Sequence, residues 1–208
     1  GEDRIAHAPV PRGDAALPTD GLHDGQRDAS EQDASGRDLP LPGDASGAGW
    51  VVEPSGTTAD LHGLFALDED HVWAVGTAGT ILRRQQSGAW KAESSGVSDD
   101  LRALWARSAD DVWAAGGSPV VHFDGGAWKS LSAAVKGNIR GLCGVSVGAA
   151  SSLLWAVGDD GSILEGGSGG AFQLLHLAGT PLEGCYASAS DAIWVVGEQG
   201  TILRGGQG

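Results

Sequence analysis

Short apolar runs separated by glycine, aspartate or serine follow one another along residues 50–208. The first two repeating units place these runs at 61–67, 71–76, 80–84 and 89–93, then at 101–107, 111–116, 120–123 and 127–131. A third unit has runs at 139–145, 153–158, 162–165 and 171–175, and a last one at 182–187, 192–197 and 201–204. Runs of about five residues bounded by turn residues are typical of antiparallel strands. The pattern therefore predicts an all-β fold.

The second run of each unit carries a tryptophan in the setting Val-Trp-Ala-Val-Gly or a close variant. These tryptophans, Trp73, Trp113, Trp155 and Trp194, recur 40, 42 and 39 residues apart. Four strands in about 40 residues is the repeat of a β-propeller blade. We predict four four-stranded blades, alone or as part of a larger ring, with the tryptophans packed between blades. The Gly-x-x-Gly turns that follow, such as 76–79, are expected to be hairpin turns with positive φ.

The last unit lacks a fourth strand, and the sequence offers a candidate before the first unit. Trp50-Val51-Val52-Glu53 matches the fourth runs, which begin at Trp90, Trp128 and Phe172. We predict that residues 50–53 pair with residues 201–204. This pairing would complete the last blade and remove an open sheet edge.

Residues 1–49 differ in composition from the repeats and are expected to form a separate region. They are rich in Asp, Gly, Ala, Pro and Ser, and they carry ten acidic side chains against four arginines. Such a segment buries too little apolar surface to offset its chain entropy. We predict a disordered acidic spacer at 1–49 and a propeller domain at 50–208.

The overall charge excludes some functions. The chain carries 27 Asp and Glu against 13 Lys and Arg, for a net charge of −14, so it lacks the basic surface that binds nucleic acid. No apolar run approaches the roughly 20 residues that span a bilayer. The chain also contains no Met, from which we expect a processed product.

No catalytic constellation stands out, and we expect a protein that is not an enzyme. No histidine lies beside a serine or cysteine with a plausible third partner, and no histidine pair has metal-ligand spacing. Two sets of residues remain as candidate ligand-binding groups. Asp60, Asp100 and Asn138 precede the first strands and could ring a channel mouth, where a calcium ion is the one cofactor considered. Trp90 and Trp128 open outer strands and could stack on a ligand.

The repeat resembles known propeller families. The motif Val-Trp-Ala-Val-Gly-x-x-Gly-x-Ile-Leu followed by Gly-x-Trp is similar to exported bacterial propeller repeats of the YVTN/WD-like, Asp-box and photosystem II assembly-factor types. Asp124-Gly125-Gly126-Ala127-Trp128 keeps only part of the Asp-box pattern. Tectonin-type lectin propellers share the central Val-Trp strand.

The acidic spacer resembles the segment after the lipid-modified cysteine of bacterial surface lipoproteins, which implies an exported protein with a lipid anchor upstream of residue 1.

These features leave three functions open. The first is a binding or scaffold propeller, exported to the cell surface or periplasm, whose partner is a protein or a glycan. The second is a tectonin-like lectin that binds carbohydrate. The third is a fragment of a larger propeller hydrolase.

The two cysteines lie in equivalent strands of neighbouring units. The alignment of Leu142-Cys143 with Cys185-Tyr186 puts the cysteines one position apart, so they point to opposite faces of their strands. Opposite faces of adjacent blades meet. A disulfide between blades and a pair of small buried thiols both satisfy this placement.

Overall fold

The computed structural model describes residues 49, 51–117, 119–132, 137–148, 151–167 and 171–206. The chain divides into one unit at Gly1–Val51 and a second at Val52–Gly208. The predicted spacer therefore lies outside the described residues apart from Gly49.

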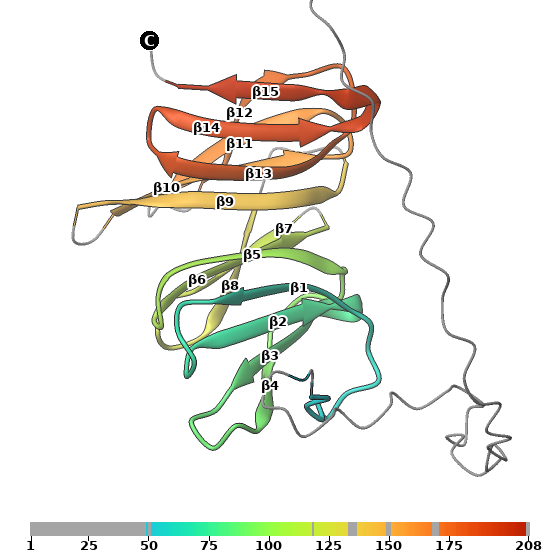
Figure 1. The fold of residues 1–208 in the computed structure, drawn as a ribbon, viewed down its shortest axis with the longest axis vertical. Helices are drawn as coiled ribbons and strands as arrows, with labels where there is room; N and C mark the ends of the chain where they lie inside the picture. Colours follow the sequence, from blue (N-terminus) through green and yellow to red (C-terminus); the bar gives the residue numbers. More distant parts are fainter. Residues whose placement is uncertain are drawn as a thin grey trace, which may run out of the picture. The chain divides into compact units, whose positions relative to one another are not determined.

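The second unit is built from antiparallel β-sheets that follow one another in chain order (Figure 1). We call them blades 1 to 4. Blade 1 contains β1 (Leu61–Ala66), β2 (Val72–Gly76), β3 (Thr80–Arg84) and β4 (Trp90–Ser94). Blade 2 contains β5 (Leu101–Ser108), β6 (Asp111–Gly116), β7 (Pro119–Phe123) and β8 (Trp128–Ser132), and blade 3 contains β9 (Ile139–Val147), β10 (Ser151–Gly158), β11 (Ser162–Gly167) and β12 (Gln173–Leu177). Blade 4 contains β13 (Leu182–Ala189), β14 (Ala192–Gly197) and β15 (Ile202–Gly205). The predicted all-β arrangement of four successive blades is confirmed.

Blade 4 differs from the prediction because it has three strands where the others have four. Val52 and Glu53 are not in a strand. The Glu53 carboxylate instead accepts hydrogen bonds from Arg84 and Trp90 of blade 1. Figure 1 gives the reason, since β5 and β9 lie between β1 and β13. A segment that leads directly into β1 stays beside blade 1, so the predicted pairing with residues 201–204 of the same chain is wrong.

Neighbouring blades pack through one repeated interface. Trp73, Val75 and Ile81 of blade 1 are buried against Leu101 and Leu104 of blade 2, together with other apolar residues of both sheets. Trp113 and Trp155 occupy the equivalent place in the next two interfaces. Large side chains in this wedge bury the most apolar area per residue. The prediction of packed tryptophans is confirmed at these three positions.

Trp194 departs from this pattern, because 46% of its surface is exposed. Blade 4 is the last of the sheets in the described residues, and none of those sheets covers its outer face. Arg204 lies over the indole ring, 5.5 Å from its centroid. The prediction of a packed Trp194 is therefore wrong for the described chain.

The Gly-x-x-Gly turns have the backbone conformation that the sequence predicts. Gly79 has a φ of +68°, and a Cβ placed on it would lie 2.1 Å from the carbonyl oxygen of Val97. Residues with side chains are strained at such φ values. Glycine is therefore required at this turn both by its dihedral angle and by the close approach of the neighbouring backbone.

Candidate binding rim

One edge of the blades is defined by a hydrogen bond that recurs in each sheet. The carbonyl oxygen just before each inner strand accepts the amide just after the second strand of the same blade. The N···O distances are 2.9 Å for Asp60 and Thr77, 2.9 Å for Asp100 and Gly117, 3.0 Å for Asn138 and Asp159, and 2.9 Å for Pro181 and Glu198. We call this edge, with the first residues of β1, β5, β9 and β13, the rim.

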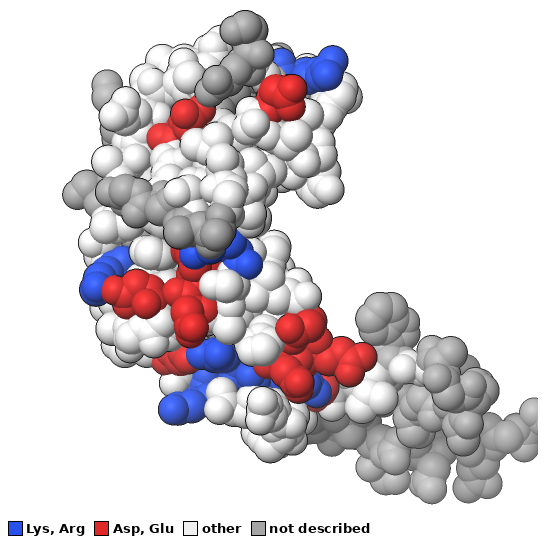
Figure 2. Space-filling model, turned by 90° about the vertical axis from the view of Figure 1, so that its left-hand side faces the viewer, with Lys and Arg blue, Asp and Glu red and all other residues white. Residues whose placement is uncertain are grey.

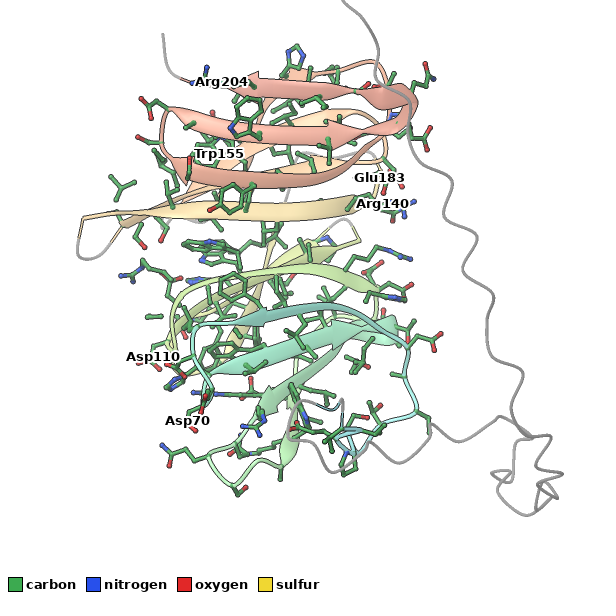
Figure 3. All side chains as sticks on the ribbon, in the orientation of Figure 1. Asp70, Asp110, Arg140, Trp155, Glu183 and Arg204 are labelled. Atoms are coloured by element: carbon green, nitrogen blue, oxygen red, sulfur yellow. A yellow bond between two sulfur atoms is a disulfide. The ribbon has the colours of Figure 1, made fainter. Side chains whose placement is uncertain are left out.

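Each inner strand carries a β-bulge at the rim. The pairing of inner and second strands skips one residue at the same place in all four blades. The extra residues are His62, Arg102, Arg140 and Glu183. A bulge bends its strand and redirects a side chain that would otherwise belong to one sheet face. Figure 3 shows Arg140 and Glu183 at this edge.

The predicted ligand Asp100 is engaged in contacts within the rim. One carboxylate oxygen accepts the backbone amide of Ala78 at 3.1 Å, and the other accepts Arg102 Nη2 at 3.3 Å. Ala78 has a φ of 52°, which is uncommon for a residue with a side chain. Asp100 therefore ties the strained turn of blade 1 to the bulge residue of blade 2.

Asn138, another predicted ligand, is held by an aspartate of its own blade. Asp159 Oδ1 accepts the Asn138 backbone amide at 2.8 Å, and Asp159 Oδ2 accepts the Asn138 side-chain amide at 2.9 Å. Arg140 Nη2 lies 3.5 Å from the same Oδ2. The Asn138 side-chain hydrogen bond, aided by its backbone amide and the Arg140 charge, holds the pKa of Asp159 below its ordinary value. The Asp159 carboxylate therefore stays ionised at neutral pH.

The rim brings the predicted column of Asp60, Asp100 and Asn138 to one edge. Among the residues that the structure describes, no three His, Cys, Asp or Glu side chains are grouped so that they could hold a metal ion. The polar groups of Asp100 and Asn138 serve the turns instead. The calcium ion stays a prediction that the geometry does not support.

The exposed charges of the rim are mostly acidic. Arg102 and Arg140 each have a carboxylate partner. Exposed acidic side chains lie around them at Asp60, Asp99, Asp160, Glu183 and Glu198. The rim therefore offers an acidic surface in which two arginines are already paired.

The bulge residues were not singled out from the sequence, although a signal for them exists. The second position of each inner strand is polar in every unit, directly after a buried or apolar Leu61, Leu101, Ile139 or Leu182. Read as simple alternation, this position belongs to one sheet face. The bulge becomes visible only when both strands are placed in register.

Of the two predicted stacking residues, Trp128 is buried and Trp90 is half-buried. Trp128 is 9% exposed, packs against blade 1, and donates its indole N–H to Glu93 Oε2 at 2.8 Å. Trp90 is half-buried and donates to Glu53 Oε2 at 3.0 Å. The expectation for Trp128 therefore needs correction, because a fourth-strand aromatic side chain that wedges between two blades is buried by both.

Cys143 and Cys185 are joined by a disulfide between blades 3 and 4, with Cα atoms 5.8 Å apart. Cys143 lies opposite Trp155 in the register of blade 3, whereas Cys185 lies opposite Val195 in blade 4. The one-position offset brings the two side chains to the faces that meet. The bond crosses an interface that is otherwise apolar.

Comparison with known proteins identifies the fold. No protein-family model and no curated protein matches the sequence. The computationally designed Ika4 protein has a similar structure, with a TM-score of 0.57, 16% identity and coverage of 75% of this chain and 96% of its own. The WD40 repeats of RRP9 give a TM-score of 0.59 at 9% identity, covering 72% and 52%. YCF48 bound to D1 peptide gives 0.52 at 23% identity, covering 68% and 50%.

This chain thus spans about half the length of RRP9 WD40 and YCF48. None of the described segments forms a helix long and apolar enough to cross a membrane. Identities this low show the fold alone. The repeat region is a β-propeller-type domain.

Proposed function

We propose that the rim binds a protein partner, and that the chain acts as a binding or scaffold propeller. The observation that carries this proposal is the bulge column, which redirects one polar side chain per blade to a single edge. Because the exposed charges around that column are acidic, the partner segment should carry Lys or Arg.

The comparisons support the proposal at a general level. Propeller-type structures include WD40 repeats, and one similar structure, YCF48, was solved bound to a peptide. Carbohydrate binding receives no such support, since Trp128 is buried between blades. We therefore favour a protein partner over a glycan.

We further propose that the protein is exported, and that a lipid anchor precedes the acidic spacer. The disulfide between Cys143 and Cys185 supports export, because such bonds persist in oxidising compartments. Protease treatment of intact cells tests this location. Degradation without lysis is expected for a chain at the cell surface, and degradation after the outer envelope alone is permeabilised for a chain in the periplasm. Full protection until the cytoplasm is released would contradict export.

Peptide binding tests the rim directly. The probes are fluorescently labelled 12-residue peptides that are rich in Lys and Arg, rich in Asp and Glu, or uncharged. The rim variant is Asp60→Asn/Glu183→Gln/Glu198→Gln. The matched control, Asp70→Asn/Asp110→Asn/Asp191→Asn, makes the same charge change in the turns at the opposite edge, where Figure 3 labels Asp70 and Asp110. Figure 2 faces that edge and shows acidic and basic side chains beside one another.

We expect the native chain to bind the basic peptide saturably at physiological salt. Three exposed charges worth about 0.5 kcal/mol each should weaken binding by roughly tenfold in the rim variant. The control should bind as the native chain does. An equal loss of peptide affinity in both variants would show that the effect depends only on net charge. Unchanged binding in the rim variant would place the site elsewhere.

A further inference from the structure

The outer face of blade 4 repeats a surface that is buried in every other blade. Trp194, Val196 and Ile202 stand where blade 1 has Trp73, Val75 and Ile81. The blade 1 residues are at most 1% exposed, whereas Ile202 is 67% exposed. The face that binds a following blade is therefore present and uncovered on blade 4.

The opposite half of the same interface is uncovered on blade 1. Leu61 and Leu64 stand where blade 2 has Leu101 and Leu104, which pack against the preceding blade. Leu64 is 64% exposed, and Leu104 is 7% exposed. The two ends of the blade series thus carry the two matching halves of one interface.

A cavity of about 530 Å³ lies between blades 3 and 4, beside the edge strand β15. Blade 3 lines it with Trp155, Ile163 and Leu175, and blade 4 with Leu203 and Gly205. In the preceding interface, Phe172 from the fourth strand region of blade 3 packs against Trp113 of blade 2, with ring centroids 6.0 Å apart. The cavity lies where the missing fourth strand of blade 4 would place its aromatic residue.

The contacts of Glu53 resemble those of a fourth-strand residue. Its carboxylate accepts the indole N–H of Trp90, as Glu93 of β4 accepts the indole N–H of Trp128. Relative to blade 1, Glu53 therefore occupies the position that a fourth-strand residue of a preceding blade would occupy. No preceding blade is present in the described chain to which this strand would belong.

We propose that a second copy of this chain completes both ends, so that two copies close one ring of eight blades. Blade 4 of each copy packs on blade 1 of the other, and residues 51–53 add to β15 of the other copy as the missing fourth strand. This head-to-tail contact closes after two copies because each copy supplies half of the ring. This chain matches about half of the RRP9 and YCF48 structures, at 52% and 50% of their lengths.

The native disulfide supplies the design of the test. In the strand register, Tyr186 of blade 4 is equivalent to Cys143 of blade 3. Leu64 of blade 1 is equivalent to Cys185 of blade 4. Tyr186 and Leu64 are both exposed, Tyr186 by 67%. The double variant Leu64→Cys/Tyr186→Cys should therefore place two thiols across each contact between copies. Leu174→Cys/Tyr186→Cys is the control, because Leu174 is exposed on the outer strand of blade 3.

Mild oxidation should convert most of the Leu64→Cys/Tyr186→Cys protein to a covalent dimer, with the new bond mapped to residues 64 and 186 by peptide mass spectrometry. The control and the single variants should remain mostly uncrosslinked. Sedimentation equilibrium of the unaltered chain should give twice the 21.0 kDa chain mass, which keeps the proposal testable if a variant fails to fold. A monomer at all concentrations, or a ladder of open oligomers, would overturn it.

Discussion

Asp111 is the buried carboxylate whose removal should cost the most stability. It lies in β6 and accepts the Trp113 indole N–H at 2.7 Å and His122 Nε2 at 2.8 Å on Oδ1. Its Oδ2 accepts Arg107 Nε at 2.6 Å. Trp113 stacks on His122 with ring centroids 3.9 Å apart. The carboxylate thus orders three side chains within blade 2.

The change Asp111→Asn keeps the shape and removes the charge. The amide oxygen can still accept from Trp113 and His122, but the amide nitrogen faces Arg107, so two donors meet. Loss of one charge-assisted hydrogen bond and of a buried ion pair should lower the free energy of unfolding by about 3 kcal/mol. For a domain of this size, the expected fall in Tm is roughly 6–12 °C.

Urea unfolding followed by tryptophan fluorescence measures this difference. Asp124→Asn is the control, because Asp124 is exposed and pairs with Lys129 at the surface, and surface pairs contribute little. The control should leave the midpoint nearly unchanged. Equal midpoints for the two variants would refute the assignment of a stabilising role to the Asp111 contacts.

The same cluster predicts a pH dependence. Burial raises the pKa of Asp111, but the hydrogen bonds from Arg107, His122 and Trp113 outweigh burial and leave the pKa below its ordinary value. A lowered pKa contributes stability that is present above the unfolded value of about 3.9 and is lost as the pH falls through the folded value. The stability difference between the native chain and Asp111→Asn should therefore shrink below about pH 3.9.

Three further changes have defined outcomes. Cys143→Ala/Cys185→Ala opens a loop with a sequence separation of 42 and should lower the free energy of unfolding by about 4 kcal/mol in urea titration; an unchanged midpoint would contradict a stabilising bond. Gly79→Ala should lower Tm well below that of Gly96→Ala, because both have positive φ but only Gly79 lies against a neighbouring carbonyl. Deletion of residues 1–49 should leave the calorimetric Tm unchanged, and a clear fall would show that this region stabilises the fold.

The strands and most of the core could be predicted because each unit repeats its own turn signals and apolar positions. Trp73, Trp113 and Trp155 have nearly the same local sequence, and all three are buried. Trp194 has that local sequence too, yet it is exposed. The local sequence indicates which face of a sheet is apolar. Whether another sheet covers that face depends on residues outside the repeat.

The rim was only partly predictable for a related reason. Asp100 and Asn138 precede their strands in the sequence, so their common edge could be expected. Arg102 and Glu183 were missed, because a bulge depends on the register between two strands. The contacts of Asp111 were likewise hidden, since His122 comes from a strand eleven residues away.

Hydrogen exchange in the presence of the basic peptide tests most directly whether the rim is the binding surface. We predict slower exchange at the rim amides when the peptide is saturating, including Thr77, Gly117, Asp159 and Glu198. The amides in the turns that contain Asp70, Asp110 and Asp191 should exchange as they do in the free chain. Protection confined to those turns, or no protection at the rim despite saturable binding, would contradict the proposal.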